Sequence, residues 1–313
     1  MPKVFSAAQI HAALDYPSLV EALRAAFAAQ KVEAPVRQAF DVGTPDATAH
    51  LLTMPAWERG VAMGVKLVTV VPGNGARGLG AVNSIYTLFD GETGAPRAIL
   101  DGDALTNRRT AAASALASSY LSRRESRTLL LVGTGHLAGY LAAAHAAVRP
   151  IARILVWGRA PEKARCVADR LKGQGLDAHT VSDLKGALAQ ADIVSCATTS
   201  TQAIVCGAEV RPGTHVDLVG AFTPAMRESD DALIARSAIY VDTRAGALAE
   251  AGDLRFPISS GAWSADLLKG DLFDLCAGRV PGRTQDDIIT VFKSVGAALE
   301  DLAAARLVVK AVG

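Results

Sequence analysis

A glycine-rich loop is the feature of this sequence that indicates chemistry most clearly. The apolar run 129–132 leads into a G-x-G-x-x-A pattern over 133–138, and an alanine-rich stretch follows. The first glycine permits a tight turn, the second lets a pyrophosphate approach bare backbone, and Ala138 lets the helix pack close to the strand. Amide groups at the helix start would face the phosphates. We therefore expect a dinucleotide site that includes Gly133, Thr134, Gly135, His136 and Leu137.

Two cations have positions that suggest a bound anionic substrate. Lys66 interrupts the apolar run 65–71, where an ammonium group is costly unless it has a partner. The alternative is a strand lysine whose charge reaches water at an edge. Arg109 lies near the start of a predicted helix, where the helix dipole is slightly unfavourable for a positive charge. Its guanidinium therefore either binds a ligand carboxylate or is solvated. Arg37 has little to recommend it by spacing alone.

Apolar strands alternate with helices along the chain after the glycine loop. Continuous apolar strands of this kind predict a parallel sheet with helices on both faces, here a doubly wound α/β Rossmann domain. The expected strands are 154–157, 192–196, 215–219 and 239–242, and the expected helices are 133–148, 161–171, 183–190 and 230–236.

The segment before the glycine loop is long enough to form a second domain. Residues 6–30 have helical periodicity, which breaks at Asp15-Tyr16-Pro17 because the residue before proline disfavours the helical region. Turn signals at 73–75 and 90–94 predict a largely antiparallel sheet. Its expected strands are 49–54, 61–71 and 81–89.

Two longer helical patterns join the domains. An Ala- and Ser-rich helix over 104–121 should cross toward the cofactor domain, and a helix over 284–307 should return to the first domain. We therefore expect an α+β substrate domain, 1–115 with 288–313, and a Rossmann domain over 116–287.

Composition excludes several classes of function. The net charge of +1 gives no electrostatic footprint for nucleic acid or an anionic membrane. No apolar run reaches the roughly 18 residues of a membrane span, and residues 1–30 do not resemble a signal peptide, so a cytoplasmic protein is expected. The four cysteines show no C-x-x-C pairing and the six histidines are scattered, so we expect neither disulfides nor a metal.

Six spaced motifs together resemble the ornithine cyclodeaminase and mu-crystallin family, in order and over almost the whole chain. Their combination is far more specific than one glycine loop. The motifs are Met54-Pro55-Ala56, Val65–Val68, Asp101-Gly102 with Thr106 and Arg109–Ala112, the Gly133 loop, Pro212–His215 leading to Val219–Ala221, and Val291–Gly296.

The resemblance implies a homodimer formed through the sheet of the substrate domain. It also implies that Arg37, Lys66 and Arg109 match the family residues that hold the substrate's carboxylate and its amine or imine beside the nicotinamide. The positions that match cofactor contacts, in addition to the glycine loop, are Thr110, Val219 and Ser294.

Two departures from the family pattern bear on the reaction. Phe222 stands where cyclodeaminases carry an aspartate, and a phenyl ring can neither accept a proton nor activate water. Ala81 stands where cyclodeaminases have a threonine that contacts substrate and cofactor, and we expect nearby Asn83 to substitute for it in part.

These departures favour an NAD(P)H-dependent ketimine reductase, which reduces pyrroline-2-carboxylate or piperideine-2-carboxylate to L-proline or L-pipecolate. Reduction of a preformed imine requires no water activation. One alternative is an ornithine cyclodeaminase, which uses NAD to convert L-ornithine into L-proline and ammonia. A second is a non-catalytic protein that binds cofactor and ligand.

The end of the second Rossmann strand indicates which cofactor is used. An acidic residue there would bind the ribose hydroxyls of NAD, but this chain has Arg159 instead. A guanidinium at that position suits the 2′-phosphate of NADP, so we expect NADP to be preferred over NAD. The alternative is a surface arginine that stacks on the adenine.

Overall fold

The chain forms two compact units in a computed structural model that describes residues 1–312. Unit 1 comprises Met1–Thr110 together with the C-terminal residues from Ala297, and unit 2 comprises Ala111–Gly296. Helix α3, Gly102–Leu121, contains the division that follows Thr110.

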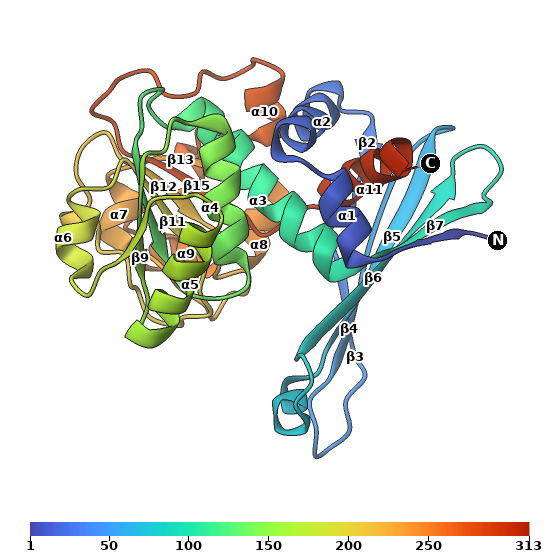
Figure 1. Ribbon diagram of the computed structural model, residues 1–313. Coiled ribbons are helices and arrows are strands. Elements are labelled where there is room, and N and C mark those ends of the chain that lie inside the picture. The colour runs from blue at the N-terminus through green and yellow to red at the C-terminus, as the bar shows by residue number, and fades with distance from the viewer. Residues whose placement is uncertain (313) are drawn as a thin grey trace. The chain divides into compact units, whose positions relative to one another are not determined.

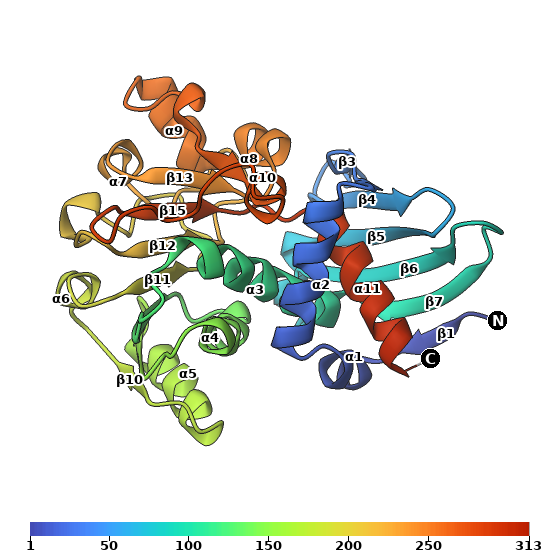
Figure 2. The same ribbon diagram turned by 90° about the horizontal axis from the view of Figure 1, so that it is seen from above.

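Unit 1 is built on a seven-stranded sheet in which β3 pairs with β4 beside the order β1-β7-β6-β5-β4-β2 (Figures 1 and 2). All pairs are antiparallel except β1 with β7, as the turn signals predicted. The three expected strands are confirmed as β4, β5 and β6. The strands are β1 Lys3–Phe5, β2 Val32–Glu33, β3 Gln38–Asp41, β4 His50–Glu58, β5 Ala62–Val70, β6 Val82–Asp90 and β7 Pro96–Asp101.

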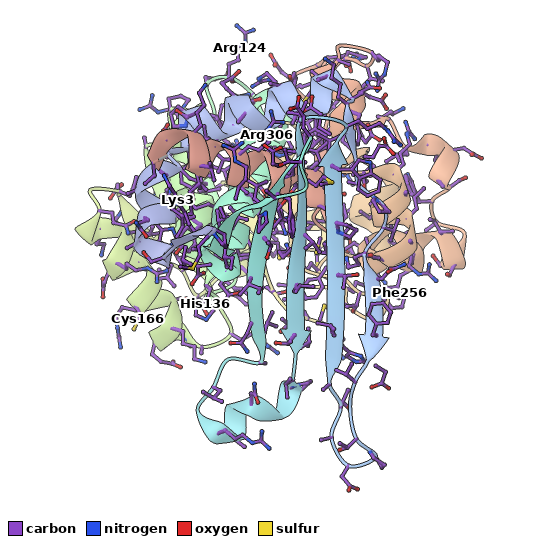
Figure 3. The ribbon with its side chains drawn as sticks, turned by 90° about the vertical axis from the view of Figure 1, so that its right-hand side faces the viewer. Lys3, Arg124, His136, Cys166, Phe256 and Arg306 are labelled. Carbon is purple, nitrogen blue, oxygen red and sulfur yellow. The ribbon has the colours of Figure 1, made fainter. Side chains whose placement is uncertain are left out.

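Helices cover one face of this sheet. Helices α1, Ala7–Ala13, and α2, Tyr16–Ala29, are separated at Asp15 as expected, because the Asp15 carboxylate accepts the backbone N–H of Ser18 at 2.9 Å and caps α2. Helix α11, Ala298–Val312, lies beside α2 (Figure 2). The other face of the sheet, seen in Figure 3, is covered by no helix among the described residues of unit 1.

Unit 2 is a doubly wound α/β domain, which confirms the predicted fold class. Its eight strands are all parallel, in the order β10-β9-β8-β11-β12-β15-β13-β14. The strands are β8 Thr128–Val132, β9 Arg153–Trp157, β10 Ala178–Thr180, β11 Ile193–Cys196, β12 His215–Leu218, β13 Ala238–Val241, β14 Gly270–Asp271 and β15 Thr290–Lys293. The helices beyond α3 are α4 Leu137–Val148, α5 Pro161–Gly173, α6 Leu184–Leu188, α7 Asp231–Ala235, α8 Arg244–Glu250, α9 Gly252–Ser260 and α10 Leu272–Cys276.

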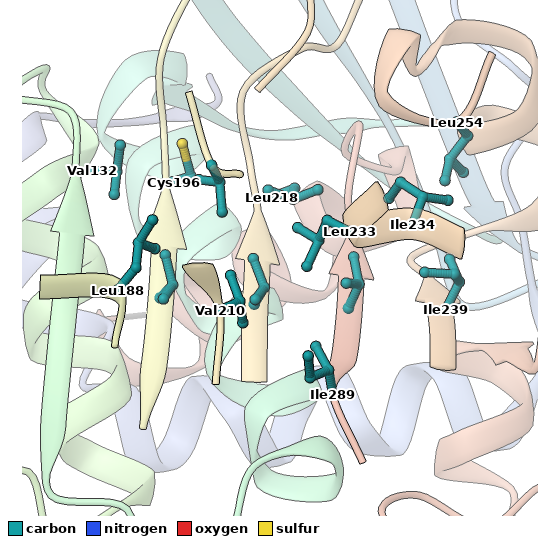
Figure 4. Packing of buried hydrophobic residues seen from close by; sticks show 14 of the residues in the cluster. Val132, Leu188, Cys196, Val210, Leu218, Leu233, Ile234, Ile239, Leu254 and Ile289 are labelled. Atoms are coloured by element: carbon teal, nitrogen blue, oxygen red, sulfur yellow. The ribbon is translucent and has the colours of Figure 1, made fainter. Parts of the chain in front are cut away.

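An apolar core runs along the central strands of unit 2 (Figure 4). Side chains such as Val132, Cys196, Leu218 and Ile239 are almost completely buried, because helices cover both faces of a parallel sheet. This core fixes the ends of the strands, where the cofactor is expected to bind.

The expected helix over 284–307 is wrong in its first half. Residues Thr290–Lys293 form β15 between β12 and β13, and α11 begins only at Ala298. The short apolar run 288–292 fits a buried strand as well as a helix, and the sheet pairing decided between them. Because β15 belongs to unit 2, the chain returns to unit 1 at Ala297 rather than at 288, and the first division follows Thr110 rather than residue 115.

Within residues 1–312, no helix combines the length and apolar character needed to cross a membrane. The four cysteines are free thiols. Among residues 1–312, no group of three or more His, Cys, Asp or Glu side chains is placed to hold a metal ion. That the protein uses no metal stays a prediction.

Candidate functional site

The glycine loop of unit 2 has the geometry that a bound dinucleotide needs. Gly133 has a φ of 115°, and a side-chain Cβ there would lie 2.5 Å from the Ala197 carbonyl oxygen. A Cβ on Gly135 would meet nothing within 4 Å, so backbone is open to a ligand at that point. His136, the N-cap residue of α4, is exposed and makes no side-chain capping hydrogen bond (Figure 3). The loop and the helix amides therefore fit a pyrophosphate.

Three of the expected cofactor residues meet at one edge of the unit 2 sheet. Four neighbouring strands end in register, at Val132, Cys196, Leu218 and Lys293. The residues that follow, which include Gly133, Val219 and Ser294, therefore lie along the carboxyl edge of the sheet. The backbone N–H of Val219 donates to the Cys196 carbonyl at 2.8 Å, and that of Ser294 donates to the Leu218 carbonyl at 3.2 Å. The strand order reverses between β8 and β11, which is where doubly wound sheets bind ligands.

The second strand of unit 2 ends beside the glycine loop. Trp157 of β9 pairs with Val132 of β8, and a Cβ on Gly158 would meet the Thr134 methyl group at 2.5 Å. Arg159 follows and is exposed. The structure thus places Arg159 two residues beyond a strand that flanks the loop.

In unit 1, Lys66 and Arg109 form a buried cluster with two acidic residues. Lys66, 2% exposed, lies on β5, and its Nζ is 2.9 Å from Oδ2 of Asp301 on α11. Arg109, 5% exposed, lies on α3 and donates from Nε to Oδ1 of Asp301 at 3.0 Å and from Nη1 to Glu300 at 2.7 Å. The alternative of a lysine that reaches water at a strand edge is therefore wrong.

The electrostatics of this cluster make the Lys66 ammonium group more acidic than that of an ordinary lysine. Burial, and next the charge of Arg109, lower the pKa of Lys66 to about 8, although Asp301 opposes this shift. Burial alone would lower the pKa of Arg109, but Asp301 and Glu300 raise it overall. Burial alone would raise the pKa of Asp301, yet Arg109 and Lys66 hold it below its usual value. Lys66 can therefore give or take a proton near physiological pH, whereas Arg109 stays cationic.

Two further expected residues lie near this cluster. Arg37 precedes Gln38, which pairs with Thr53, and the next residue of β4, Met54, pairs with Lys66. The charge of Arg37 contributes to the lowered pKa of Lys66, as its place in the register implies. Thr110 directly follows Arg109 on α3.

Asn83 does not lie beside Lys66 in the sheet of unit 1, and its expected contact with substrate stays a prediction. Lys66 pairs with Tyr86, so these two side chains share the covered face of the sheet. Asn83 pairs with Thr69 on the opposite face and donates to the Gly80 carbonyl at 3.1 Å. Successive side chains of a strand point to opposite faces, so Asn83 and Lys66 lie on different sides of the sheet although their strands pair. Thr106, whose Oγ1 lies 3.4 Å from Lys66 Nζ, does reach the cluster.

Glu300 and Asp301 were not predicted as site residues from the sequence. Both lie in the first turn of α11 and are completely buried. Two adjacent acids in a largely apolar helix were an available signal, since buried carboxylates need cationic partners. The helix was expected to start at 284, so the two acids did not mark its first turn.

The two units define a dinucleotide-binding Rossmann fold joined to an α+β unit with a buried cation cluster. The chain belongs to the ornithine cyclodeaminase/mu-crystallin family, whose model matches residues 2–312. The resemblance predicted from the six motifs is confirmed.

Known relatives agree with this assignment. The chain is 43% identical over 310 residues to a Delta(1)-pyrroline-2-carboxylate reductase of Paracoccus denitrificans, with 99% of this chain and 96% of the relative covered. A structure of Thermococcus litoralis Delta(1)-pyrroline-2-carboxylate reductase in complex with NADH and L-proline is 32% identical, with a TM-score of 0.93 and 98% and 96% of the two chains covered. An archaeal alanine dehydrogenase dimer with bound NAD is 26% identical, with a TM-score of 0.91 and 99% and 95% covered.

The shared carboxylate of Asp301 should be a main source of stability in unit 1. We expect Asp301→Asn to lower the free energy of unfolding by about 3 kcal/mol at pH 7, because it leaves two buried cations with one acidic partner. Since the pKa of Asp301 is lowered in the fold, its contribution is present above the usual aspartate range and is lost as the pH falls through the lowered value. Denaturant unfolding of wild type and variant at several pH values measures this difference.

Glu58→Gln is the matched control, since Glu58 and Arg306 form an ion pair at 2.5 Å with side chains 19% and 42% exposed. We expect this control to cost less than about 1 kcal/mol. An equally small cost for Asp301→Asn would contradict the role given to Asp301.

Proposed function

We propose that this protein is an NAD(P)H-dependent ketimine reductase that reduces a cyclic imino acid, pyrroline-2-carboxylate or piperideine-2-carboxylate, to L-proline or L-pipecolate. The observation that carries the proposal is the buried cluster of Lys66 and Arg109 on Asp301. The names of the reductase relatives support the choice of substrate.

In this proposal the cations of unit 1 bind and orient the imino acid. Asp301 and Glu300 occupy Nε and Nη1 of Arg109, and among the described residues Nη2 has no hydrogen-bond partner. Nη2 would bind the substrate carboxylate, with Arg37 as a second contact. Asp301 fixes both Lys66 and Arg109, so the two cations are positioned before the substrate arrives.

Reduction of a C=N bond adds a hydride to carbon and a proton to nitrogen. The bound dinucleotide would supply the hydride, held by Thr110, Val219, Ser294 and the glycine loop. The Lys66 ammonium would supply the proton to the imine nitrogen, since a pKa of about 8 keeps it protonated yet acidic enough to transfer.

Phe222 argues against the alternative of ornithine cyclodeaminase. It follows β12 at the cofactor edge and is 43% exposed, and its ring offers no base for the release of ammonia. The presence of Lys66 argues against a protein that only binds its ligands, because a buried lysine with a lowered pKa is typical of proton transfer. Arg109 and Arg37 support the same conclusion, since both can bind a substrate carboxylate.

We further propose that NADPH is preferred over NADH. The glycine loop and the solved relatives with NADH or NAD support a nicotinamide dinucleotide. The preference itself rests on Arg159, an exposed guanidinium at the position where an acid would bind the ribose hydroxyls of NAD.

We also propose a homodimer formed through the uncovered face of the unit 1 sheet. Strand alternation places Met63, Leu67 and Ile85 on that face, with Leu67 paired to Ile85. Met63 and Ile85 are 36% and 48% exposed, and an apolar face of this kind is typical of a subunit interface. The dimer described for the archaeal alanine dehydrogenase supports this proposal.

Replacement of Lys66 tests the reaction. We expect Lys66→Met to lower the kcat for reduction of pyrroline-2-carboxylate by about 100-fold or more, because the proton donor is lost. The wild-type rate should fall as the pH rises above about 8, where Lys66 loses its proton, and the variant should lack this fall. The oxidation of NADPH, followed by its absorbance, gives both pH profiles.

The control for this variant is Lys172→Met, an exposed lysine on α5 with a 52% exposed side chain. If the kcat of Lys66→Met lies within about threefold of the control, Lys66 is not the proton donor.

Replacement of Arg159 tests the cofactor preference. We expect Arg159→Asp to lower kcat/KM for NADPH by about 10- to 100-fold and to spare NADH, because a charge-assisted contact to the 2′-phosphate is lost. Arg165→Asp, on the exposed side of α5, is the control. Equal wild-type efficiency with the two cofactors would contradict the preference.

A charge placed on the sheet face tests the dimer. Light scattering should give wild type twice the chain mass of 32.4 kDa, and Ile85→Glu should give the chain mass itself, because a carboxylate would be buried without a partner. Leu267→Glu, at a residue 55% exposed in unit 2, should leave the mass unchanged. A monomeric wild type would overturn the proposal.

A further inference from the structure

A second buried charge cluster lies below the cofactor edge of unit 2. Glu228, Asp253 and Lys293 have no exposed surface. Lys293 ends β15, Asp253 lies in the first turn of α9, and Glu228 lies between β12 and α7. The proposed reaction uses none of the three, and burial of three charges is costly unless they bind specific partners.

Their hydrogen bonds reach the two segments that follow β11 and β12. Oε1 of Glu228 accepts the backbone N–H of Thr198 at 2.6 Å and its hydroxyl at 2.9 Å. Nζ of Lys293 donates to the Gly220 carbonyl and lies 3.3 Å from Oδ2 of Asp253. Oδ1 of Asp253 accepts the backbone N–H of Glu228 at 2.8 Å, which fixes the Glu228 main chain. The cluster thus holds Thr198 and Gly220 together.

The segment after β11 packs directly against the glycine loop, and the segment after β12 packs against Thr198. A Cβ on Gly133 would lie 3.1 Å from the Thr198 methyl group. A Cβ on Gly220 would collide with the Thr198 carbonyl and the Glu228 carboxylate. Ala221, next in the chain, has a φ of 47°, which a residue with a side chain adopts only where its surroundings impose it. The backbone at the cofactor edge is therefore closely constrained by the cluster beneath it.

We propose that Glu228 is a positioning residue of the dinucleotide site: through Thr198, and together with Lys293 on Gly220, it sets the spacing of the segments after β11 and β12 relative to the glycine loop. This role rests on the proposed dinucleotide site of unit 2. Glu228 is buried below the segments that it holds, so it acts through Thr198 and not by contact with the ligand.

The charge of Glu228 should make this positioning depend on pH. Burial raises the pKa of Glu228 to about 7, opposed by Lys293 and reinforced by Asp253. The groups that face it are Lys293 from β15, Asp253 from α9 and the Cys196 thiol from β11. Protonation replaces an anionic acceptor of the Thr198 hydrogen bonds with a neutral one, so the hold weakens as the pH falls through this range.

The test measures NADPH binding by the whole protein from pH 6 to pH 8.5, a range chosen to span the pKa of about 7. We expect Glu228→Gln to raise the Kd for NADPH about tenfold at the alkaline end, where wild-type Glu228 is ionised, and much less at the acid end. The 2′-phosphate titrates equally in both proteins, so the ratio of the two Kd values isolates Glu228. The KM for the imine should stay unchanged, whereas general damage to the fold would alter it.

Glu209→Gln is the matched control, because Glu209 lies in unit 2 and pairs with Lys185 at 3.8 Å, away from Thr198. We expect it to bind NADPH as wild type does. A Kd ratio for Glu228→Gln that stays near one, or that does not vary with pH, would overturn the proposal.

Thr198→Val is the second test variant if Glu228→Gln fails to fold. It removes only the hydroxyl group that donates a hydrogen bond to Glu228. We expect a weaker Kd for NADPH in this variant too, and an unchanged Kd would overturn the proposal. Failure of the reductase proposal has a different signature: wild type would bind NADPH but turn over no cyclic imine, and the Kd ratios would still decide the role of Glu228.

Discussion

The carboxylate of Asp301 holds two buried cations, and the arrangement of unit 1 depends on it. Lys66 on β5 and Arg109 on α3 both bind this one side chain on α11. Without it, two buried positive charges would share Glu300 as their one acidic partner, which is unfavourable. The same contacts keep Arg109 charged and bring the pKa of Lys66 to about 8. One ion cluster therefore supplies both a fixed cation and a titratable one.

In unit 2 the corresponding constraint is the register of the parallel strands. Because β8, β11, β12 and β15 end together, segments far apart in the sequence meet at one edge. Burial of the strands on both faces leaves only their carboxyl ends available for a ligand. The charges of Glu228 and Lys293 lie directly below this edge and hold its backbone. Both units thus place buried charges beneath or within the sites that we propose.

The sequence predicted the Rossmann unit well because its signals are local. Its apolar strands and glycine pattern depend on neighbours in the chain, as does the break at Asp15 in unit 1. It predicted β15 wrongly, because a four-residue strand is defined by its pairing with β12 and β13 and not by its own periodicity. Lys66 and Arg109 were recognised as unusual residues. Their partner Asp301 could not be, because it is 192 positions from Arg109 in the sequence. The sequence also did not show that Asn83 and Lys66 lie on opposite faces, because the pairing of the strands decides this.

The most direct test of the proposed reaction compares two assays of the wild-type protein. One follows NADPH oxidation with pyrroline-2-carboxylate and piperideine-2-carboxylate, and the other follows ammonia release from L-ornithine with NAD. We expect rapid reduction of at least one imine and no ammonia above background, because Phe222 offers no base and Lys66 offers a proton. Ammonia release without imine reduction would contradict the proposed function.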